Sequence, residues 1–455
     1  TLWTIASPFI LFVILCILIY LPPIQNFLVD KAAVYASEAT GMNISVERIS
    51  LSFPLNLVVT NVDAASPHND TLLSVRRLQV NVQLLPLLKK QVEVDGISLQ
   101  GATVNSNDLI HGMKLNGTLG ELFISSHGVA LDPETAIVNK VLLKDTDLSL
   151  CLNDTAAADT AASDTAYWKI ILQDIDLQNV SFALDMPLDS LSLAASLDNA
   201  ILRDGLIDLH KSAYSLQTFR IENGRVRYDN GKPLAADSLS SGLDPSHIAL
   251  TDIGVKLDSL YYGGRNMKAI ISQFVLKERS GVEIVSATGR MVSNDKVLRV
   301  PSLKLETRDS YLELNAAMDW NALDFKGEGL VSARLMADIG KPDVVRFMGR
   351  MDEKFVRQYP SEPLRIRTGI DGDLNKLKLT TLTAELPGAL GLFARGELTH
   401  LTDSLLRGGD ITLEAETKDL KFVSTLAEGI EIPYGTRSEE HTSELQSPRY
   451  LVCRL

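Results

Sequence analysis

The sequence predicts a mostly β protein, with one N-terminal transmembrane helix followed by a long, strand-rich body that contains few short helices. Three observations support this class. No charged residue occurs from Thr1 to Val29, apolar and polar residues alternate beyond Gly41, and turn dipeptides such as Asp95-Gly96 separate the alternating runs. A period of two buries one face of a strand, and such dipeptides connect antiparallel strands. At 455 residues, we expect several domains or one elongated, repetitive body.

The apolar run that begins at Trp3 is predicted to span a membrane. About 19 residues of helix, at a rise of 1.5 Å each, cover roughly 29 Å, which matches the hydrocarbon core of a bilayer. Trp3 and Tyr20 fall at the two ends, where amphipathic rings favour the headgroup layer, and Phe9 and Phe12 lie between them. These four residues are the predicted anchor residues.

The residues around this run define the predicted anchor. A cleaved signal peptide is the alternative, but the run is longer than a signal core and no small-residue cleavage site follows Pro22-Pro23. We therefore assign residues 1–22 to an uncleaved anchor. An amphipathic helix is expected over residues 23–41, with Gly41 at its end, either on the lipid surface or against the end of the β body. Because the chain starts with Thr, we expect a preceding initiating segment.

Composition divides the body into several parts. Residues 42–154 and 167–436 carry the alternating pattern, and similar short segments recur in them at nearly equal spacing, which indicates a weak repeat. Residues 155–166 contain only Thr, Ala, Asp and Ser, so we expect a flexible surface loop. Apolar residues at helical spacing predict a helix near residues 342–357, with Pro342 in its first turn, that docks on the sheet or contacts lipid.

The sequence offers no support for catalysis or metal binding. Seven histidines lie without ligand spacing, and of three cysteines only Cys151 is in the body, so neither a zinc site nor a disulfide framework is indicated. Nucleophile-elbow, phosphate-loop and dinucleotide motifs do not occur. Asp145 with Asp147, and Asp174 with Asp176, share a strand face and are interpreted as solvated surface. A net charge of −13 argues against nucleic acid. We predict a non-enzyme without metal or cofactor.

A long sheet with one apolar face needs something to cover that face. Two helices in the body are too few for this, so two arrangements remain open: two facing sheets, or one sheet curled into a gutter that lipid chains fill. In the second arrangement, alternating residues close to the membrane end are the candidates to line the groove, namely Leu78, Val80, Val82 and Leu84.

A series of short motifs follows the apolar run in a fixed order: Leu21-Pro-Pro-Ile-Gln25, a helix ending at Gly41, Ile44–Pro54, Leu57–Val62, Asp70–Leu78, Val80–Leu88 and Val94–Leu99. Their order and spacing resemble the N-terminal region of the AsmA-like and TamB (translocation and assembly module) proteins. The resemblance covers residues 1–105, and the remainder to residue 436 is similar in style.

This resemblance implies a single-pass protein of the bacterial inner membrane, whose periplasmic body is an elongated, curled antiparallel β-groove. The family is associated with phospholipid transport between membranes and with outer-membrane protein assembly. The implied partners are membrane phospholipid and an outer-membrane BamA/TamA-like barrel. Acyl chains would be held by burial, at about 0.8 kcal/mol per CH₂, without catalytic residues. A membrane-tethered β-sandwich that binds or adheres is the alternative, and an enzyme is a more distant one.

The C-terminal residues differ from the rest of the body. From Arg437 the sequence reads Arg-Ser-Glu-Glu-His-Thr-Ser-Glu-Leu-Gln-Ser447, which resembles a translated sequencing adapter, and the alternation stops there. We therefore interpret residues 437–455 as a non-native tail. The natural protein is expected to continue beyond Thr436.

Overall fold

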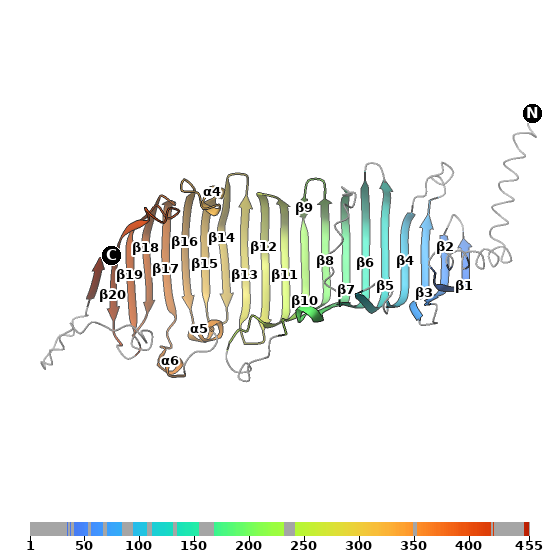
Figure 1. Ribbon diagram of the computed structural model, residues 1–455, viewed down its shortest axis with the longest axis horizontal. Helices are drawn as coiled ribbons and strands as arrows, with labels where there is room; N and C mark the ends of the chain where they lie inside the picture. Colours follow the sequence, from blue (N-terminus) through green and yellow to red (C-terminus); the bar gives the residue numbers. More distant parts are fainter. Residues whose placement is uncertain are drawn as a thin grey trace, which may run out of the picture. The chain divides into compact units, whose positions relative to one another are not determined.

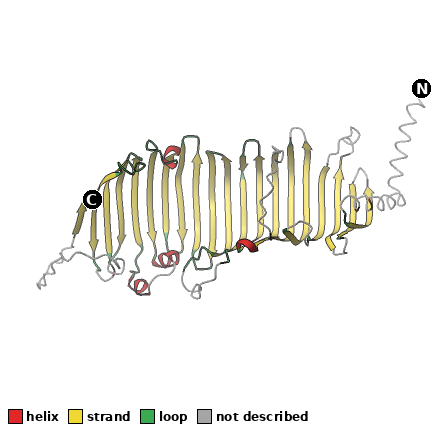
Figure 2. Cartoon of the chain, viewed as in Figure 1, coloured by secondary structure: helices red, strands yellow, loops and turns green. Residues whose placement is uncertain are grey.

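The computed structural model describes residues 34, 37, 41–52, 56–66, 71–83, 94–106, 112–130, 134–153, 168–231, 242–348, 353–419, 422 and 450–454. The chain folds as two compact units, Thr1–Lys232 and Pro233–Leu455. Strands dominate the described residues of both units and helices are few, which confirms the mostly β class (Figure 2).

The predicted anchor, with Trp3, Phe9, Phe12 and Tyr20, lies outside the described residues. Among the residues that are described, no helix is long and apolar enough to cross a membrane. Val34 and Ser37 are helical, and the Gly41 N–H donates to the Ser37 carbonyl at 2.9 Å. Gly41 has a φ of +68°, a left-handed backbone that is typical of the residue after a helix.

The strands of the first unit lie side by side in one sheet (Figure 1). Its elements are β1 (Asn43–Ser52), β2 (Asn56–Ala65), β3 (Thr71–Val82), β4 (Val94–Asn105), β5 (Met113–Ala130), β6 (Thr135–Leu152), β7 (Lys169–Met186), the 3-10 turn η1 (Pro187–Asp189), β8 (Leu191–Asp208), β9 (Ala213–Leu216) and β10 (Thr218–Asp229). Consecutive strands pair antiparallel from β1 to β6 and from β7 to β8, and both β9 and β10 pair with β8.

The pair β6 and β7 is parallel, with Thr135 opposite Lys169. Parallel neighbours begin at the same edge of a sheet, so the chain must cross between the two edges to connect them. The connecting residues 154–167, with the predicted flexible loop 155–166, lie outside the described residues.

A row of left-handed residues, which we name the crease, runs across the middle of this sheet. Its members have φ values from 48° to 61°, and they lie opposite one another through the register of the intervening strands: Asn61, Gly101, Asp145, Asn179 and Asn223. Gly adopts this backbone freely, and Asn and Asp tolerate it because their short side chains bond locally. The Asn179 amide donates to Asp145 Oδ1 at 2.9 Å, which links two neighbouring members of the row.

The crease changes the alternation of the strands that it crosses. In β4, Ile97 and Leu99 precede Gly101, and Ala102 and Val104 follow it. All four are at least half-buried, whereas Gln100 is exposed. A slip of one residue normally moves a whole apolar set to the other face of a strand. Here the left-handed residue absorbs that slip, so one face stays apolar on both sides of the crease.

The second unit is also one sheet, in which every pairing is antiparallel between consecutive strands. Its elements are β11 (His247–Gly263), β12 (Asn266–Glu278), β13 (Glu283–Ser293), β14 (Val297–Thr307), β15 (Tyr311–Asp319), α4 (Trp320–Leu323), β16 (Leu330–Ile339), α5 (Lys341–Met348), α6 (Glu353–Gln358), β17 (Leu364–Asp373), β18 (Lys376–Leu386), β19 (Leu390–Thr399), β20 (Gly408–Thr417) and β21 (Tyr450–Arg454). Where one helix near residues 342–357 was predicted, the described residues form α5 and α6.

Strand β21 falls within residues 437–455 and pairs with β20, with Leu413 opposite Cys453. The edge of a sheet presents unpaired N–H and C=O groups that accept any extended segment. The origin of the tail therefore stays a prediction from its sequence.

Two caps close opposite strand ends of the second unit (Figure 1). In the α4 cap, Ala322 packs with Val331 and Leu377 at one end. In the aromatic cap, Tyr359 and Phe422 pack with Leu386 and Ala389 at the other end, against Phe355 of α6 and Val344 of α5. Each cap therefore covers apolar residues at the end of the strands rather than at their centre.

Candidate functional site

The apolar face of the first unit runs across the strands β1 to β8 and on to β10. Residues directly opposite each other on neighbouring strands point to the same side of a sheet, so the register identifies rows that cross it. One row is Leu51, Leu57, Val80, Ile97, Ile124, Val141, Ile175, Leu202 and Phe219, and the next is Ile49, Val59, Leu78, Leu99, Leu122, Leu143, Leu177, Ala200 and Ile221. These two rows lie on one side of the crease.

The face continues beyond the crease. The first row there is Val46, Val62, Val75, Ala102, Leu119, Thr146, Val180 and Leu197, and the second is Ile44, Ala64, Leu73, Val104, Gly117, Leu148, Phe182, Ala195 and Val226. No charged side chain stands in any of the four rows. We use the term apolar face for these four rows together.

Side chains of the apolar face remain partly accessible. Those of the first two rows are half-buried, apart from Ala200, which is buried. Helical structure in the described part of the first unit is limited to Val34, Ser37 and η1, so no helix described there is long enough to cover the face. Neighbouring strands supply the burial of these side chains, and the apolar face offers a surface to which an apolar ligand could bind.

The opposite face of the same sheet is mostly polar, although the row that contains Gln79 and Ser98 also includes Val58, Phe123, Leu142 and Ile201. One of its rows reads Thr60, Arg77, Gln100, Glu121, Lys144, Gln178, Asn199 and Glu222. Arg203 pairs on this face with both Asp174 and Asp176, the latter at 3.1 Å. Asp147 accepts a hydrogen bond from the Ser181 hydroxyl. The carboxylate pairs noted in the sequence therefore make cross-strand contacts on the polar side, and Asp145 belongs to the crease.

The predicted groove residues all belong to β3 or follow it. Leu78 and Val80 lie in the first two rows of the apolar face, on one side of the crease, and Val82 lies opposite Val94, just after a shift in register. All three are half-buried. Leu84 lies outside the described residues. That these side chains contact lipid stays a prediction.

Sequence reasoning missed most of the apolar face because the crease interrupts strict alternation. In β7, Leu177 and Val180 share a face although they are three residues apart. A search for period two therefore ends at Asn179. The detectable signal is an Asn, Asp or Gly between two apolar runs whose phases differ by one residue.

The second unit also has an apolar face. One of its rows is Leu314, Leu335, Thr368, Leu382, Ala394 and Leu413, and the next is Leu312, Ala337, Ile366, Ala384, Leu392 and Ala415. The α4 cap and the aromatic cap pack on the two strand ends of this face. The accessible rows therefore lie between two closed ends, and several of their residues are Ala.

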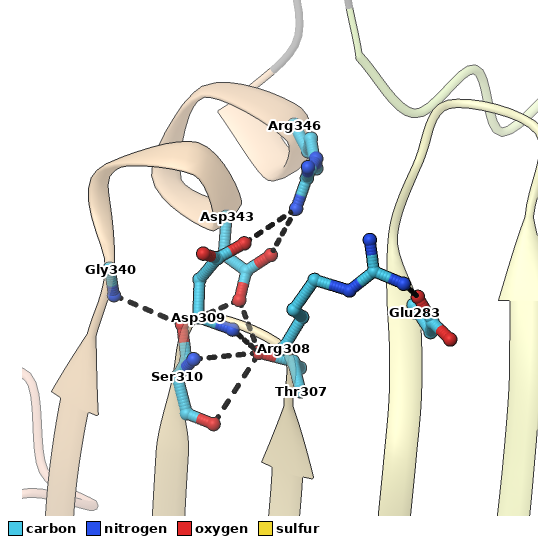
Figure 3. A network of polar contacts seen from close by, with 8 residues as sticks. All are labelled: Glu283, Thr307, Arg308, Asp309, Ser310, Gly340, Asp343 and Arg346. Carbon is cyan, nitrogen blue, oxygen red and sulfur yellow. Dashed lines mark hydrogen bonds and ion pairs between the residues drawn. The ribbon is translucent and has the colours of Figure 1, made fainter.

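A buried polar cluster fixes α5 to the turn between β14 and β15 (Figure 3). Asp343 is fully buried and accepts hydrogen bonds from the hydroxyls of Thr307 and Ser310, the second at 2.6 Å. Arg346 Nη1 lies 3.1 Å from Asp343 Oδ1 and 2.9 Å from Asp309 Oδ2. These contacts occupy the carboxylate of Asp343, so we interpret the cluster as a structural clamp. In the part of the chain that is described, no group of His, Cys, Asp or Glu side chains could hold a metal ion.

The aromatic cap contains one buried polar atom without a partner. The Tyr359 hydroxyl makes no hydrogen bond to any described residue. The main-chain carbonyl of Tyr359 accepts a hydrogen bond from Lys341 Nζ at 2.8 Å. Burial raises the pKa of Tyr359 above the ordinary tyrosine value. The ring packs against Phe422 edge-on, with centroids 5.6 Å apart, so the side chain contributes through its apolar surface.

Comparison with known proteins does not assign a family. The sequence matches no family model and no curated protein. The resemblance to AsmA-like and TamB proteins therefore rests on the order of the N-terminal motifs alone.

Proposed function

We propose that the protein is a lipid conduit, in which acyl chains of membrane phospholipid lie on the apolar face of the first unit. The observation that carries this proposal is the set of four rows that cross the sheet without a charged side chain. The rows run perpendicular to the strands. An acyl chain that follows them meets Leu, Ile or Val on each strand from β1 to β8 and on β10.

Binding of this kind rests on the hydrophobic effect, which requires no particular orientation of the acyl chain. Each buried CH₂ group contributes about 0.8 kcal/mol, and no hydrogen bond or catalytic group is required. Headgroups remain in water, and the polar face of the sheet can face the same water. We infer that the sheet curls around the acyl chains as an elongated groove, because partly exposed Leu and Ile residues then lose further contact with water.

The cellular setting follows from the sequence resemblance. We propose that residues 1–22 anchor the chain in the bacterial inner membrane and that the body lies in the periplasm. The conduit would then accept phospholipid at the membrane and support outer-membrane protein assembly, with an outer-membrane BamA/TamA-like barrel as its partner. The polar outer face and the negative charge of the chain suit an aqueous compartment.

Lipid mass spectrometry on the purified full chain tests this proposal. Leu78 and Leu99 lie directly opposite each other on the apolar face, and Gln79 and Ser98 do so on the polar face. The double variant Leu78→Gln, Leu99→Gln is expected to retain less phospholipid per chain than the wild type. The matched double variant Gln79→Ala, Ser98→Ala should retain as much phospholipid as the wild type, because it leaves the apolar face unchanged. Phospholipid around the predicted anchor is common to the wild type and both variants and does not affect the comparison. Equal retention by both variants would rule out the apolar face as the binding surface.

A further inference from the structure

The second unit exposes large apolar side chains on loops at one end of its strands. We name this group the rim patch: Leu323 and Phe325 lie between β15 and β16, and Leu405 and Leu406 lie between β19 and β20. Leu405 is 92% exposed and Phe325 is 75% exposed. Single exposed apolar residues are common on protein surfaces, but several of them on loops at the same strand ends mark an interaction site.

Main-chain hydrogen bonds connect both loops of the rim patch to the turn that lies between them. The Asn375 N–H, in the turn between β17 and β18, donates to the Gly327 carbonyl at 3.1 Å, and the His400 N–H donates to the Asn375 carbonyl at 3.0 Å. Beneath them, Leu374 and Leu401 pack on the α4 cap. The loops therefore rest on a packed base.

The tips of both loops are shaped by local contacts. The Asp403 carboxylate accepts hydrogen bonds from the N–H groups of Leu405 at 2.9 Å and Leu406 at 3.4 Å. The Arg407 N–H donates to the Asp403 carbonyl at 2.9 Å. On the other tip, Phe325 has a φ of 55°, which bulky residues rarely adopt. The fold thus holds these side chains outward.

We propose that the rim patch inserts into the surface of a lipid bilayer. Four side chains on two tips are too few for a stable protein interface, which buries about 1,600 Å² in total. Leu is also under-represented among the residues that dominate protein interfaces. A bilayer needs no matching shape and accepts isolated Leu and Phe side chains below the headgroups.

The charges around the rim patch are mixed. Lys326 and Arg407 are exposed beside the tips and can reach headgroup phosphates, but Lys326 also lies 3.8 Å from Asp324. The chain as a whole carries a net charge of −13. The contact is therefore apolar rather than electrostatic, and it forms on neutral phosphatidylcholine and persists at high salt.

A fluorescence experiment on the full chain tests this inference. Cys16, Cys151 and Cys453 are replaced by Ser, and a fluorescent label is attached through Leu405→Cys. The control label is attached through Leu188→Cys, since Leu188 is an equally apolar residue of the first unit that is 64% exposed. Both proteins are reconstituted with phosphatidylcholine vesicles that contain lipids with a nitroxide quencher in the acyl chain.

Quenching severalfold stronger at position 405 than at position 188, and unchanged at high salt, supports insertion. Phe325→Ser with Leu406→Ser should then reduce quenching at position 405. Equal quenching at the two positions, or contact between labels of two copies in place of quenching, overturns the inference. The inference does not depend on lipid binding by the apolar face. The Leu78→Gln, Leu99→Gln variant changes only that face and leaves the rim patch intact, so the label at position 405 should be quenched in this variant as in the wild type.

Discussion

The two units use the same kind of sheet but treat its apolar face differently. In the first unit, strands of 18 residues carry an apolar face that continues through the crease. In the second unit, strands such as β16, β17 and β19, each of 10 residues, carry a face whose strand ends are packed under the α4 cap and the aromatic cap. The first unit thus stabilises an extended accessible face through its backbone, whereas the second unit stabilises a shorter one through packing.

This difference bears on where ligand binds. The capped ends contribute a core to the fold, because Val331, Leu377, Leu386 and Phe422 are buried there in the absence of any ligand. A face without caps keeps the same kind of side chain half-buried and gains from a further apolar partner. We therefore expect the first unit to depend on lipid for part of its stability, and the second unit to depend on its caps.

The largest effect is expected at the aromatic cap. Phe422 is 1% exposed and contacts both Phe355 and Tyr359, so Phe422→Ala should lower the free energy of unfolding of the second unit by about 4 kcal/mol through loss of burial and a residual cavity. Urea denaturation followed by Trp320 fluorescence measures it. The exposed Phe325→Ala is the matched control and should cost about 0.5 kcal/mol or less. Similar losses in both variants would show that the cap does not stabilise the unit.

The clamp beneath α5 should have the next largest effect. Asp343→Ala leaves two hydroxyls and the Arg346 guanidinium without their buried acceptor, which should cost about 3 kcal/mol. Arg357→Ala removes an exposed ion pair with Glu353 on the next helix and should change little. The same denaturation experiment applies. A small loss in Asp343→Ala would mean that α5 is held by its apolar contacts instead.

The crease is tested by a substitution that its backbone disfavours. Asn179 has a φ of 51°, so Asn179→Val should destabilise the first unit by about 2 kcal/mol, from the left-handed backbone and the lost bond to Asp145. Asn179→Gly keeps the backbone and loses only the side-chain bond, so it should cost about 1 kcal/mol. Hydrogen exchange of the amides of β6 and β7 reports the change. If both variants behave alike, the left-handed geometry is not what the position requires.

The smallest effect is expected from Tyr359→Phe. This change removes a buried hydroxyl that has no described partner, so the free energy of unfolding should stay within about 0.5 kcal/mol of the wild type or rise slightly. A clear loss of stability at neutral pH would instead reveal a hydrogen bond to the hydroxyl.

The same variant isolates a dependence on pH. Because burial raises the pKa of Tyr359, the unfolded chain releases this proton first as the pH rises through about 10. The unfolded state then binds fewer protons than the folded state, so stability falls with rising pH above that value. The wild type should therefore lose more stability than Tyr359→Phe between about pH 9 and about pH 11. Parallel curves for the two proteins would contradict the burial effect.

The sequence predicted the class of fold and the first part of the apolar face. Alternation identified Leu78 and Val80 because they lie in an uninterrupted run on one side of the crease. It could not extend the face through β7, because Asn179 shifts the phase by one residue and only strand register shows that Val180 returns to the same side. The α4 cap and the aromatic cap could not be predicted from the sequence either. Phe422 meets Phe355 and Tyr359 through packing of distant segments, which no local pattern contains.

Site-specific photo-cross-linking to lipid tests the central claim most directly. A photoreactive residue is introduced into the full chain at Leu99, on the apolar face, or at Gln100, on the polar face of the same strand. After irradiation in membranes, phospholipid should be attached to the chain at position 99 and not at position 100. Equal attachment at both positions, or none at position 99, would contradict the account of the apolar face as a lipid path.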